Sequence, residues 1–408
     1  MNSSAKTASD QTVGKPVSAG RPTLSNTVAR RFLKTCEGIE VGHLTVTTPD
    51  GERYRFGNGG GREAELVVRD WGAISALAAR GDIGFGEAYI QGLWDSSSIE
   101  DLTSLALENE DALDSHLHGS RWNQALFLLT DRFLRRNSRK GSKRNIQAHY
   151  DVGNDFYRLW LDPTLTYSSA LYANPDASLE EAQTRKYNRL LEQTEGTGES
   201  VLEIGCGWGG FAEAAADQGR NVTGLTISPS QHAFATERLA GKSANIALCD
   251  YRDVRGKYDS IVSIEMIEAV GERYWPAYFG QIKQRLADHG RAAIQAIIVE
   301  DEHFPAYRSR SDFIRHYTFP GGMLLSPGKI AEEAARAKMA AENVFRFGQD
   351  YARTLREWVE RFEAAGPKIK ALGYSDGFMR SWRFYMEICA ASFAVGRTDV
   401  IQVELRHA

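Results

Sequence analysis

The chain has 408 residues, and its 49 Lys and Arg against 53 Asp and Glu leave a formal net charge of −4. Hydrophobic residues make up 42% of it, a share that excludes a wholly disordered chain, a coiled coil and a fibrous repeat. Because domains commonly contain about 100–200 residues, the length predicts two domains with real hydrophobic cores.

The N-terminal end and the cysteines indicate the compartment. Residues 1–28 are rich in Ser, Thr, Lys and Gly, which predicts a flexible leader, with a transit peptide as the alternative because acidic residues are sparse there. No apolar run approaches the roughly 18–20 residues of a membrane-spanning helix. Cysteines without any CxxC spacing favour a reducing, cytoplasmic compartment, and they are Cys36, Cys206, Cys249 and Cys389.

Residues 29–120 are predicted to form a small α+β domain. Two β-type runs, 44–48 and 53–56, lie on either side of a Pro-Asp-Gly turn, which is the pattern of a hairpin. A third predicted strand, 64–69, leads into a helix over 73–80. No catalytic cluster is apparent in this part of the sequence.

Residues 121–145 are predicted to form a basic helical linker. Its basic residues are Arg132, Arg135, Arg136, Arg139, Lys140, Lys143 and Arg144. They form either a solvated helix face with a flexible linker or a surface for anionic lipid headgroups, where each basic side chain is worth about 1 kcal/mol. The acidic chain as a whole argues against a nucleic-acid partner.

Residues 146–408 are predicted to form an α/β catalytic domain. Helices alternate with predicted strands at 200–204, 221–227, 246–249, 258–264 and 291–299, and two late strands follow at 344–347 and 400–405. This alternation predicts a doubly wound, mostly parallel sheet. An aromatic-rich insert of loop and helix over 300–341 interrupts it.

A glycine-rich turn follows the first strand of this domain. Gly205, Gly207 and Gly210 fit the GxGxxG pattern of a nicotinamide oxidoreductase, and glycines at such a turn let the backbone approach a ligand closely. That class of enzyme expects an acid at the end of the next strand, where 224–228 reads Gly-Leu-Thr-Ile-Ser. A turn that binds nothing is a further alternative. Glu203 followed by glycines at alternate positions is instead typical of an S-adenosylmethionine-dependent methyltransferase.

Several separated motifs together resemble the cyclopropane-fatty-acyl-phospholipid synthase family, which includes the mycolic acid cyclopropane synthases. Besides the glycine loop they are HYDVGNDFY (149–157), LTYSSA (165–170), GLTISPSQ (224–231), EAVG (268–271), YTFPGG (317–322) and DYARTL (350–355). These motifs are in family order, and GDIGFGEAY (81–89) is similar to the N-terminal domain of the longer members.

The resemblance implies a Rossmann-like methyltransferase that transfers a one-carbon unit from S-adenosylmethionine to the double bond of an unsaturated acyl chain in membrane phospholipid, giving a cyclopropane. The cofactor-binding residues implied by the motifs are Tyr167, Ser168, Glu203, Gly205, Gly207, Gly209, Thr226, Ser228 and Gln231. The family also holds a bicarbonate ion, and the matching catalytic residues are Ser169, Glu268, Gln295, Ile297 and Tyr385.

The chemistry accounts for these residue types. Attack of an alkene on a sulfonium methyl leaves a carbocation, and bicarbonate is expected to remove its proton. Glu268 would orient the ion, while Tyr385 and Ser169 would donate hydrogen bonds to it. Aromatic faces stabilise a cation by up to about 2 kcal/mol, and the candidates are Tyr150, Phe156, Tyr317 and Phe319.

Structural alternatives exist for the same residues. Glu268 also fits a helix N-terminal carboxylate, and Tyr385 belongs to an aromatic stripe of the kind that usually packs in a core. His149 and His316 have no partner at metal-ligand spacing, so no metal site is predicted.

Three positions depart from the family pattern and put the product in question. Ser169 stands where cysteine is usual, while Ala269 and Gln295 stand where histidine is usual. Serine and glutamine still hydrogen-bond an oxyanion, so an anion site is expected. Loss of a different proton would give a methylene- or methyl-branched chain.

The sequence thus predicts an enzyme of the cytoplasm that associates peripherally with the inner face of the membrane. Its N-terminal domain is expected to support dimerisation, as a homodimer, or lipid capture. The rival hypotheses are a methyltransferase for another small molecule, a non-catalytic lipid-binding protein and, last, the nicotinamide oxidoreductase.

Overall fold

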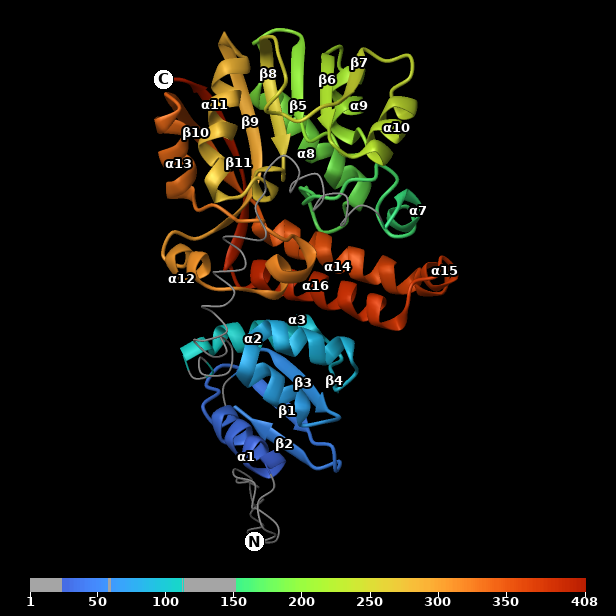
Figure 1. Cartoon of the computed structure of the whole chain (residues 1–408), viewed down its shortest axis with the longest axis vertical. Helices are drawn as coiled ribbons and strands as arrows, with labels where there is room; N and C mark the ends of the chain where they lie inside the picture. Colours follow the sequence, from blue (N-terminus) through green and yellow to red (C-terminus); the bar gives the residue numbers. More distant parts are fainter. Residues whose placement is uncertain (1–23, 58–59, 112, 114–151) are drawn as a thin grey trace, which may run out of the picture.

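The computed structural model describes residues 24–57, 60–111, 113 and 152–408. They form two bodies stacked along the long axis of the molecule (Figure 1), which we call the N-terminal unit (24–113) and the C-terminal unit (152–408). The basic segment 121–145 and both of its predicted boundaries lie outside the described residues.

The N-terminal unit is a four-stranded sheet with three described helices. Its elements are α1 (Leu24–Cys36), β1 (His43–Thr47), β2 (Arg53–Phe56), β3 (Glu63–Val68), α2 (Gly72–Ile90), β4 (Trp94–Asp95) and α3 (Ile99–Glu108). The strand order is β2-β1-β3-β4, with β1 antiparallel to β2 and parallel to β3. Alternate residues of β3 are buried, as one-sided packing of a strand requires.

Two boundaries differ from the sequence-based expectation. Helix α1 begins at Leu24 and so includes the last residues of the predicted leader, because Val28 and Phe32, four positions apart, pack on the same core. Helix α2 continues beyond residue 80 to Ile90 through a kink at Gly81, whose φ of 60° favours glycine.

The C-terminal unit contains a seven-stranded sheet of order β10-β11-β9-β8-β5-β6-β7. Its strands are β5 (Ser200–Ile204), β6 (Asn221–Thr226), β7 (Ala244–Leu248), β8 (Tyr258–Ile264), β9 (Leu286–Val299), β10 (Met339–Arg346) and β11 (Thr398–His407). Strands β5 to β9 pair in parallel, whereas β11 is antiparallel to both of its neighbours. This is the predicted Rossmann-like, mostly parallel sheet.

Helices cover the sheet and extend from one end of it. They are α7 (Asn154–Tyr157), α8 (Leu179–Gln193), α9 (Gly210–Asp217), α10 (Pro229–Arg238), α11 (Trp275–Arg285), α12 (Phe304–Ser309), α13 (Pro327–Arg336), α14 (Gly348–Ala364), α15 (Gly366–Ala371) and α16 (Asp376–Ala394). Short helical turns are η1 (Ile267–Ala269), η2 (Glu272–Tyr274) and the π-helical η3 (Ile314–Thr318). Within the described residues, no helix is long and apolar enough to cross a membrane.

Helices α14 and α16 lie between the sheet and the N-terminal unit (Figure 1). Glu387 on α16 accepts hydrogen bonds from the first backbone N–H groups of α3, those of Ile99 at 2.6 Å and Glu100 at 3.0 Å. Gly86 on α2 leaves room for the ring of Phe384, since a Cβ there would lie 2.6 Å from it. The N-terminal unit therefore docks closely on the helix that carries Tyr385.

Candidate active site

The glycine loop turns sharply between β5 and α9. Gly205, Gly207 and Gly209 all have positive φ, at 87°, 50° and 86°, a region where side chains are disfavoured. A Cβ on Gly205 would lie 2.8 Å from Met266 Cγ, whereas one on Gly207 would meet nothing within 4 Å. The backbone N–H of Gly205 donates to the carbonyl of Leu225 on β6. The loop is thus held at the carboxyl end of the sheet, with open space over Gly207.

A buried lysine supports the loop segment that carries Tyr167 and Ser168. Lys186 Nζ donates to Ser168 Oγ and to Gln183 Oε1, each at 2.6 Å, and Gln183 Nε2 donates to the Ser168 carbonyl at 3.0 Å. Lys186 is 0% exposed, and burial lowers its pKa to about 7. The lysine therefore fixes one wall of the site from behind.

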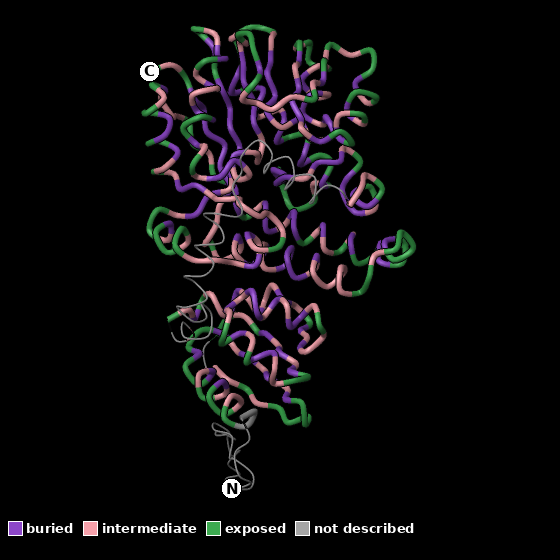
Figure 2. The backbone as a smooth tube through the Cα atoms, viewed as in Figure 1, coloured by how far each residue is buried: buried purple, intermediate pink, exposed green. Residues whose placement is uncertain are grey.

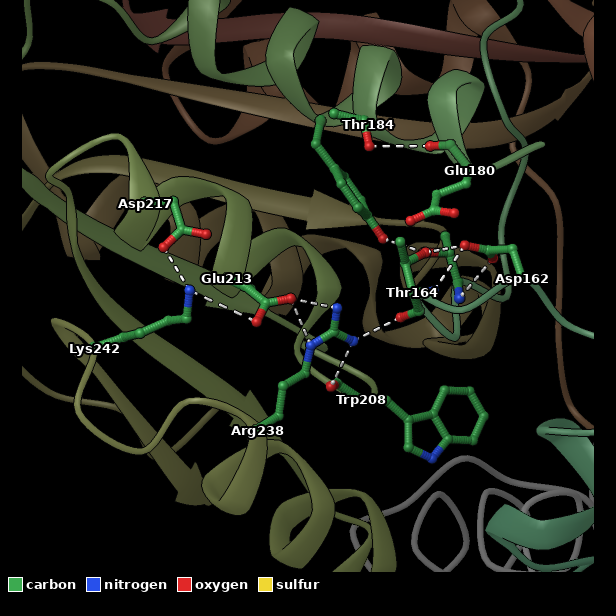
Figure 3. Close-up of polar contacts among 11 residues, drawn as sticks. Asp162, Thr164, Glu180, Thr184, Trp208, Glu213, Asp217, Arg238 and Lys242 are labelled. Atoms are coloured by element: carbon green, nitrogen blue, oxygen red, sulfur yellow. Dashed lines mark hydrogen bonds and ion pairs between the residues drawn. The ribbon is translucent and has the colours of Figure 1, made fainter. Parts of the chain in front are cut away.

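Arg238 on α10 ties three segments around the glycine loop together (Figure 3). Its guanidinium donates to Glu213 on α9 at 2.5 and 2.9 Å, and to the carbonyls of Thr164 at 2.6 Å and Trp208 at 3.4 Å. A planar fork of donors suits such a junction, because several acceptors are held at fixed angles. Arg238 thereby sets the spacing between the glycine loop and the segment before Tyr167.

The start of α10 forms the next part of the site. Ser228 is its N-cap residue and accepts from the backbone N–H of Gln231 at 3.4 Å. Thr226 Oγ1 donates to Gln231 Oε1 at 2.9 Å. Thr226 and Gln231 line the cavity described below, while Ser228 and Gly209 act behind it as cap and turn.

Glu203 leaves a buried acceptor beside the glycine loop. The residue is 2% exposed, and its Oε2 has no hydrogen-bond partner among the described residues. Burial raises its pKa to about 8, against the opposing effect of Arg238 and Lys186. A buried polar atom without a partner is costly unless a ligand supplies one, so Glu203 fits the role of a ligand-binding residue.

The glycine loop, Glu203, Thr226 and Gln231 line a cavity of about 710 Å³. It runs from the glycine loop past Tyr167 and Glu265 to Glu268, Ile297 and Tyr385. That volume lies in the range of small-molecule sites, and most of the lining side chains are apolar. The predicted cofactor and catalytic regions therefore share one cavity.

Glu265 and Glu268 form a pair of acids in this cavity. Glu265 has a φ of 48°, and its carboxylate accepts hydrogen bonds from Ser169 N–H and Gln295 Nε2 at 2.8 Å and from Tyr351 OH at 2.7 Å. Burial raises its pKa, while Lys186 and these donors oppose the rise. Glu265 is therefore held in place by three donors at an unusual backbone angle of the kind common at functional sites.

Glu268 has far fewer partners. Its Oε1 accepts from the backbone N–H of Ile297 at 2.6 Å, and its Oε2 has no partner among the described residues. Burial and repulsion from Glu265 raise its pKa to about 8. Glu268 is accordingly a neutral acid near pH 7, with one O–H available to a ligand.

The five predicted catalytic residues separate into two groups. Glu268, Ile297 and Tyr385 line the cavity, but Ser169 and Gln295 are not among its described lining residues. Ser169 Oγ donates to the carbonyl of Ala170 at 3.0 Å, contrary to the expectation that it would donate to the anion. Ser169 N–H and the Gln295 amide instead contact Glu265, because both are 0% exposed beneath the cavity wall.

The aromatic candidates also separate. Tyr385 OH lies 3.0 Å from Tyr167 OH, and the Phe319 ring is 6.0 Å from that of Tyr385 in an edge contact. Tyr317 is 46% exposed and bonded to Glu87, while Phe156 packs inside an aromatic core. Phe319 therefore lies at the cavity, Phe156 and Tyr317 do not line it, and Tyr150 is outside the described residues.

Four contributors were not predicted from the sequence: Lys186, Glu265, Tyr351 and Asp250. Lys186 lies on α8, where nothing in the local sequence indicates its role. Tyr351 contributes by donating a hydrogen bond to Glu265, a contact that the sequence alone does not indicate. Asp250 follows Cys249 just after β7 and lines the cavity. An acid after a parallel strand was the one available signal, because ligands bind at the carboxyl ends of such strands.

Comparison with known proteins agrees with this geometry. The model of the mycolic acid cyclopropane synthetase family matches residues 137–403. The chain belongs to this family. It is 35% identical to the tuberculostearic acid methyltransferase UfaA1 of Mycobacterium tuberculosis over 95% of this chain and 92% of that one. It is 32% identical to the cyclopropane-fatty-acyl-phospholipid synthase of Escherichia coli K12, over 88% and 94%.

A solved structure supports the same assignment. Mycolic acid cyclopropane synthase CmaA1, crystallised with SAH and CTAB, superposes with a TM-score of 0.60 at 30% identity, covering 64% of this chain and 97% of that one. The chain is therefore an S-adenosylmethionine-dependent methyltransferase of this family. The glycine loop, the open space over Gly207 and Glu203 Oε2, which has no partner among the described residues, all fit that cofactor.

Proposed function

We propose that this enzyme transfers a one-carbon unit from S-adenosylmethionine to the double bond of an unsaturated fatty acyl chain in membrane phospholipid, with a cyclopropane as the product. The observation that carries the proposal is the single cavity, which joins the glycine loop to Glu268 and Tyr385 through a mainly apolar lining. Such a lining suits an acyl chain better than a polar small molecule. A methyltransferase acting on another small molecule and a non-catalytic lipid-binding protein remain the rival hypotheses.

The cofactor residues in this proposal are those around the loop. When bound, S-adenosylmethionine supplies an electrophilic methyl group on a positively charged sulfur. Gly205, Gly207 and Glu203 would hold it on one side, and Tyr167 with Gln231 on the other. The buried acid of Glu203 supports this assignment, because a cationic ligand with polar groups gives its Oε2 a partner.

The proposal includes a bicarbonate ion as the base that takes the proton from the alkylated chain. Glu268 suits this anion because its neutral carboxyl can donate from Oε2, whereas a carboxylate there would repel it. The hydroxyl groups of Tyr385 and Tyr167, which also line the cavity, are further donors. Ile297 contributes by holding Glu268 through its backbone N–H.

A methylene- or methyl-branched chain is the second candidate product. The relative named tuberculostearic acid methyltransferase favours it, since its identity of 35% exceeds the 32% of the Escherichia coli cyclopropane synthase. Gln295 also favours it, because that amide is engaged by Glu265 and Gln402 rather than turned to the cavity. A ring, a methylene branch and a methyl branch that keeps the double bond follow from the same transfer step and differ in the proton removed.

The place of action is part of the proposal. We place the enzyme at the inner face of the cytoplasmic membrane, where a phospholipid substrate lies, as a peripheral protein and a homodimer. The basic segment Arg132 to Arg144 is the sequence feature that supports membrane contact. Charge reversal there should abolish co-sedimentation with anionic vesicles at low salt, and unchanged co-sedimentation would remove this part of the proposal.

The decisive experiment uses purified protein, methyl-labelled S-adenosylmethionine and vesicles of a monounsaturated phospholipid. Released fatty esters are separated by gas chromatography and identified by mass spectrometry. A labelled ester establishes acyl modification, and its fragmentation separates a ring from a branch. An unlabelled lipid pool, with cofactor binding demonstrated by calorimetry, would refute the proposed function.

A further inference from the structure

The cavity does not end in the C-terminal unit. Beyond Tyr385 it is lined by Phe384 and Ile388 of α16 and by Phe85 of α2, and it then enters the N-terminal unit. The residues around Tyr385 and those of the N-terminal core belong to one continuous hydrophobic cluster. An apolar path therefore leads from the part of the cavity lined by Tyr385 into the N-terminal unit.

The far end of the cavity is walled by the core of the N-terminal unit. Its lining includes Phe32, Cys36, Leu44, Leu66, Leu77 and Leu102, which come from helices α1, α2 and α3 and strands β1 and β3. Each of these side chains is less than a tenth exposed (Figure 2 shows the buried interior of this unit). The far end is thus lined by buried, mainly apolar side chains, together with the polar Thr35, Thr103 and Glu110.

A small unit gains little stability by leaving its core unfilled. Protein interiors are close-packed, and wall atoms beside a void lose their dispersion contacts. Apolar cavities also stay dry and take up apolar ligands instead of water. The far end therefore suits a hydrocarbon. Because the same cavity reaches Glu268, that hydrocarbon would belong to the molecule that reacts there.

Resting on the proposed function, we propose that the N-terminal unit is the receptacle for the methyl-terminal half of the substrate's acyl chain. The far end receives the terminal methyl group of the chain, and the double bond then lies at Glu268 and Tyr385. The unit would act as a gauge of the chain length beyond the double bond. Asp82, which also lines this path, is turned to the protein, since its Oδ2 accepts from Phe313 N–H at 2.9 Å.

The first test needs no substitution. Vesicles carry a phosphatidylethanolamine whose oleoyl chain has a diazirine at its terminal carbon, and the wild-type enzyme is irradiated with them in the presence of S-adenosylhomocysteine. Adducts are expected on peptides that contain Leu66, Leu77 or Leu102. Adducts confined to residues 152–408, or none while the same lipid is methylated, would overturn the receptacle.

The second test measures selectivity with Cys36→Phe and Leu102→Phe, which place larger side chains in the lining of the far end from α1 and α3. Val41→Phe is the matched control, because Val41 is 45% exposed in the same unit. Oleoyl and palmitoleoyl chains are identical up to the double bond, and oleoyl has two more methylenes beyond it. Each buried methylene is worth roughly fourfold in binding, so the filled variants should lose about 15-fold in oleoyl over palmitoleoyl preference.

The outcomes separate the two proposals. Wild-type enzyme that methylates neither chain would refute the proposed function. Wild-type activity with an unchanged preference in the folded, cofactor-binding variants would refute the receptacle alone. If a filled variant does not fold, the adduct map on the wild-type enzyme decides.

Discussion

Glu268 carries a prediction whose size follows from its surroundings. Burial and the neighbouring Glu265 raise its pKa from 4.5 to about 8, so the folded protein favours the protonated acid. Because folding raises the pKa of this acid, the protonated carboxyl contributes its full stability below about pH 4.5, the pKa of the same group in the unfolded chain. That effect is lost as pH rises toward 8, because the unfolded chain ionises first.

The substitution Glu268→Gln removes this ionisation and keeps the shape. At pH 7 the unfolded carboxyl is about 2.5 pH units past its pKa, and at 1.36 kcal/mol per unit this corresponds to about 3 kcal/mol. Relaxation of a protein around a buried charge reduces the value, so we expect the variant to be about 2 kcal/mol more stable than the wild type at pH 7. Near pH 4.5 the two proteins should be equally stable.

The same variant should be nearly inactive. A glutamine accepts the hydrogen bond from the Ile297 N–H and still offers an amide N–H, but it cannot exchange a proton with the proposed bicarbonate base, and loss of a proton-transfer group costs about 10²–10⁴ in rate. Binding of S-adenosylhomocysteine should change little, because the residues of the glycine loop are untouched. A gain in stability with a loss of turnover is the exchange expected at a strained active site.

Urea unfolding at several pH values measures the stability difference, and calorimetry measures cofactor affinity. Glu237→Gln is the matched control, since Glu237 is exposed on α10 and its substitution should leave stability and turnover unchanged. A stability difference between Glu268→Gln and wild type that does not vary with pH would refute the neutral buried acid. A large loss of cofactor affinity would show that Glu268 belongs to the cofactor site instead.

Three further substitutions test the other walls of the site. Tyr385→Phe removes the hydroxyl 3.0 Å from Tyr167 OH and should lower turnover about 10²-fold with cofactor affinity unchanged. Lys186→Met deprives the buried Ser168 hydroxyl of its donor and should weaken cofactor binding about tenfold in calorimetry. Arg238→Lys cannot hold a carboxylate and two carbonyls at once, and should lower both cofactor affinity and the thermal midpoint.

Surface substitutions of the same kind serve as controls for these three. Tyr258→Phe, Lys370→Met and Arg336→Lys alter side chains that lie outside the cavity, and each should leave cofactor affinity unchanged. Unaltered calorimetry for Lys186→Met would remove the lysine from the cofactor wall. Equal loss of binding and turnover in Tyr385→Phe would assign the tyrosine to the cofactor rather than to the anion.

The sheet was predictable because its signals are local. Most strands of the C-terminal unit have a β-rich run that can be recognised without its neighbours. The predicted strands at 200–204 and 258–264 coincide with β5 and β8, whereas β10 begins at Met339, before the predicted run at 344–347. The glycine loop was equally accessible, since a strand followed by alternate glycines has few structural explanations. Boundaries failed where packing decided them, as at Leu24 in α1.

The second layer of the site was not predictable, because it depends on contacts between distant segments. Glu265 meets Ser169 from 96 residues away and Tyr351 from 86 residues away. Neither contact can be recognised from the spacing of residues in the local sequence. The expectation for Ser169 depends on the fold in the same way: its motif placed it near the reaction, and in the structure its hydroxyl donates to the carbonyl of Ala170.

The arrangement of the two acids suits the cationic donor and the anionic base of the proposed reaction. Glu265 is surrounded by three donors and faces the charge of Lys186, all of which favour its carboxylate. Glu268 faces that carboxylate with one backbone donor, and this favours its neutral form. Burial raises the pKa of both acids, so the two differ in their hydrogen-bond partners. Glu265 is held by three donors, and Glu268 supplies the hydrogen-bond donor that the proposed anion requires.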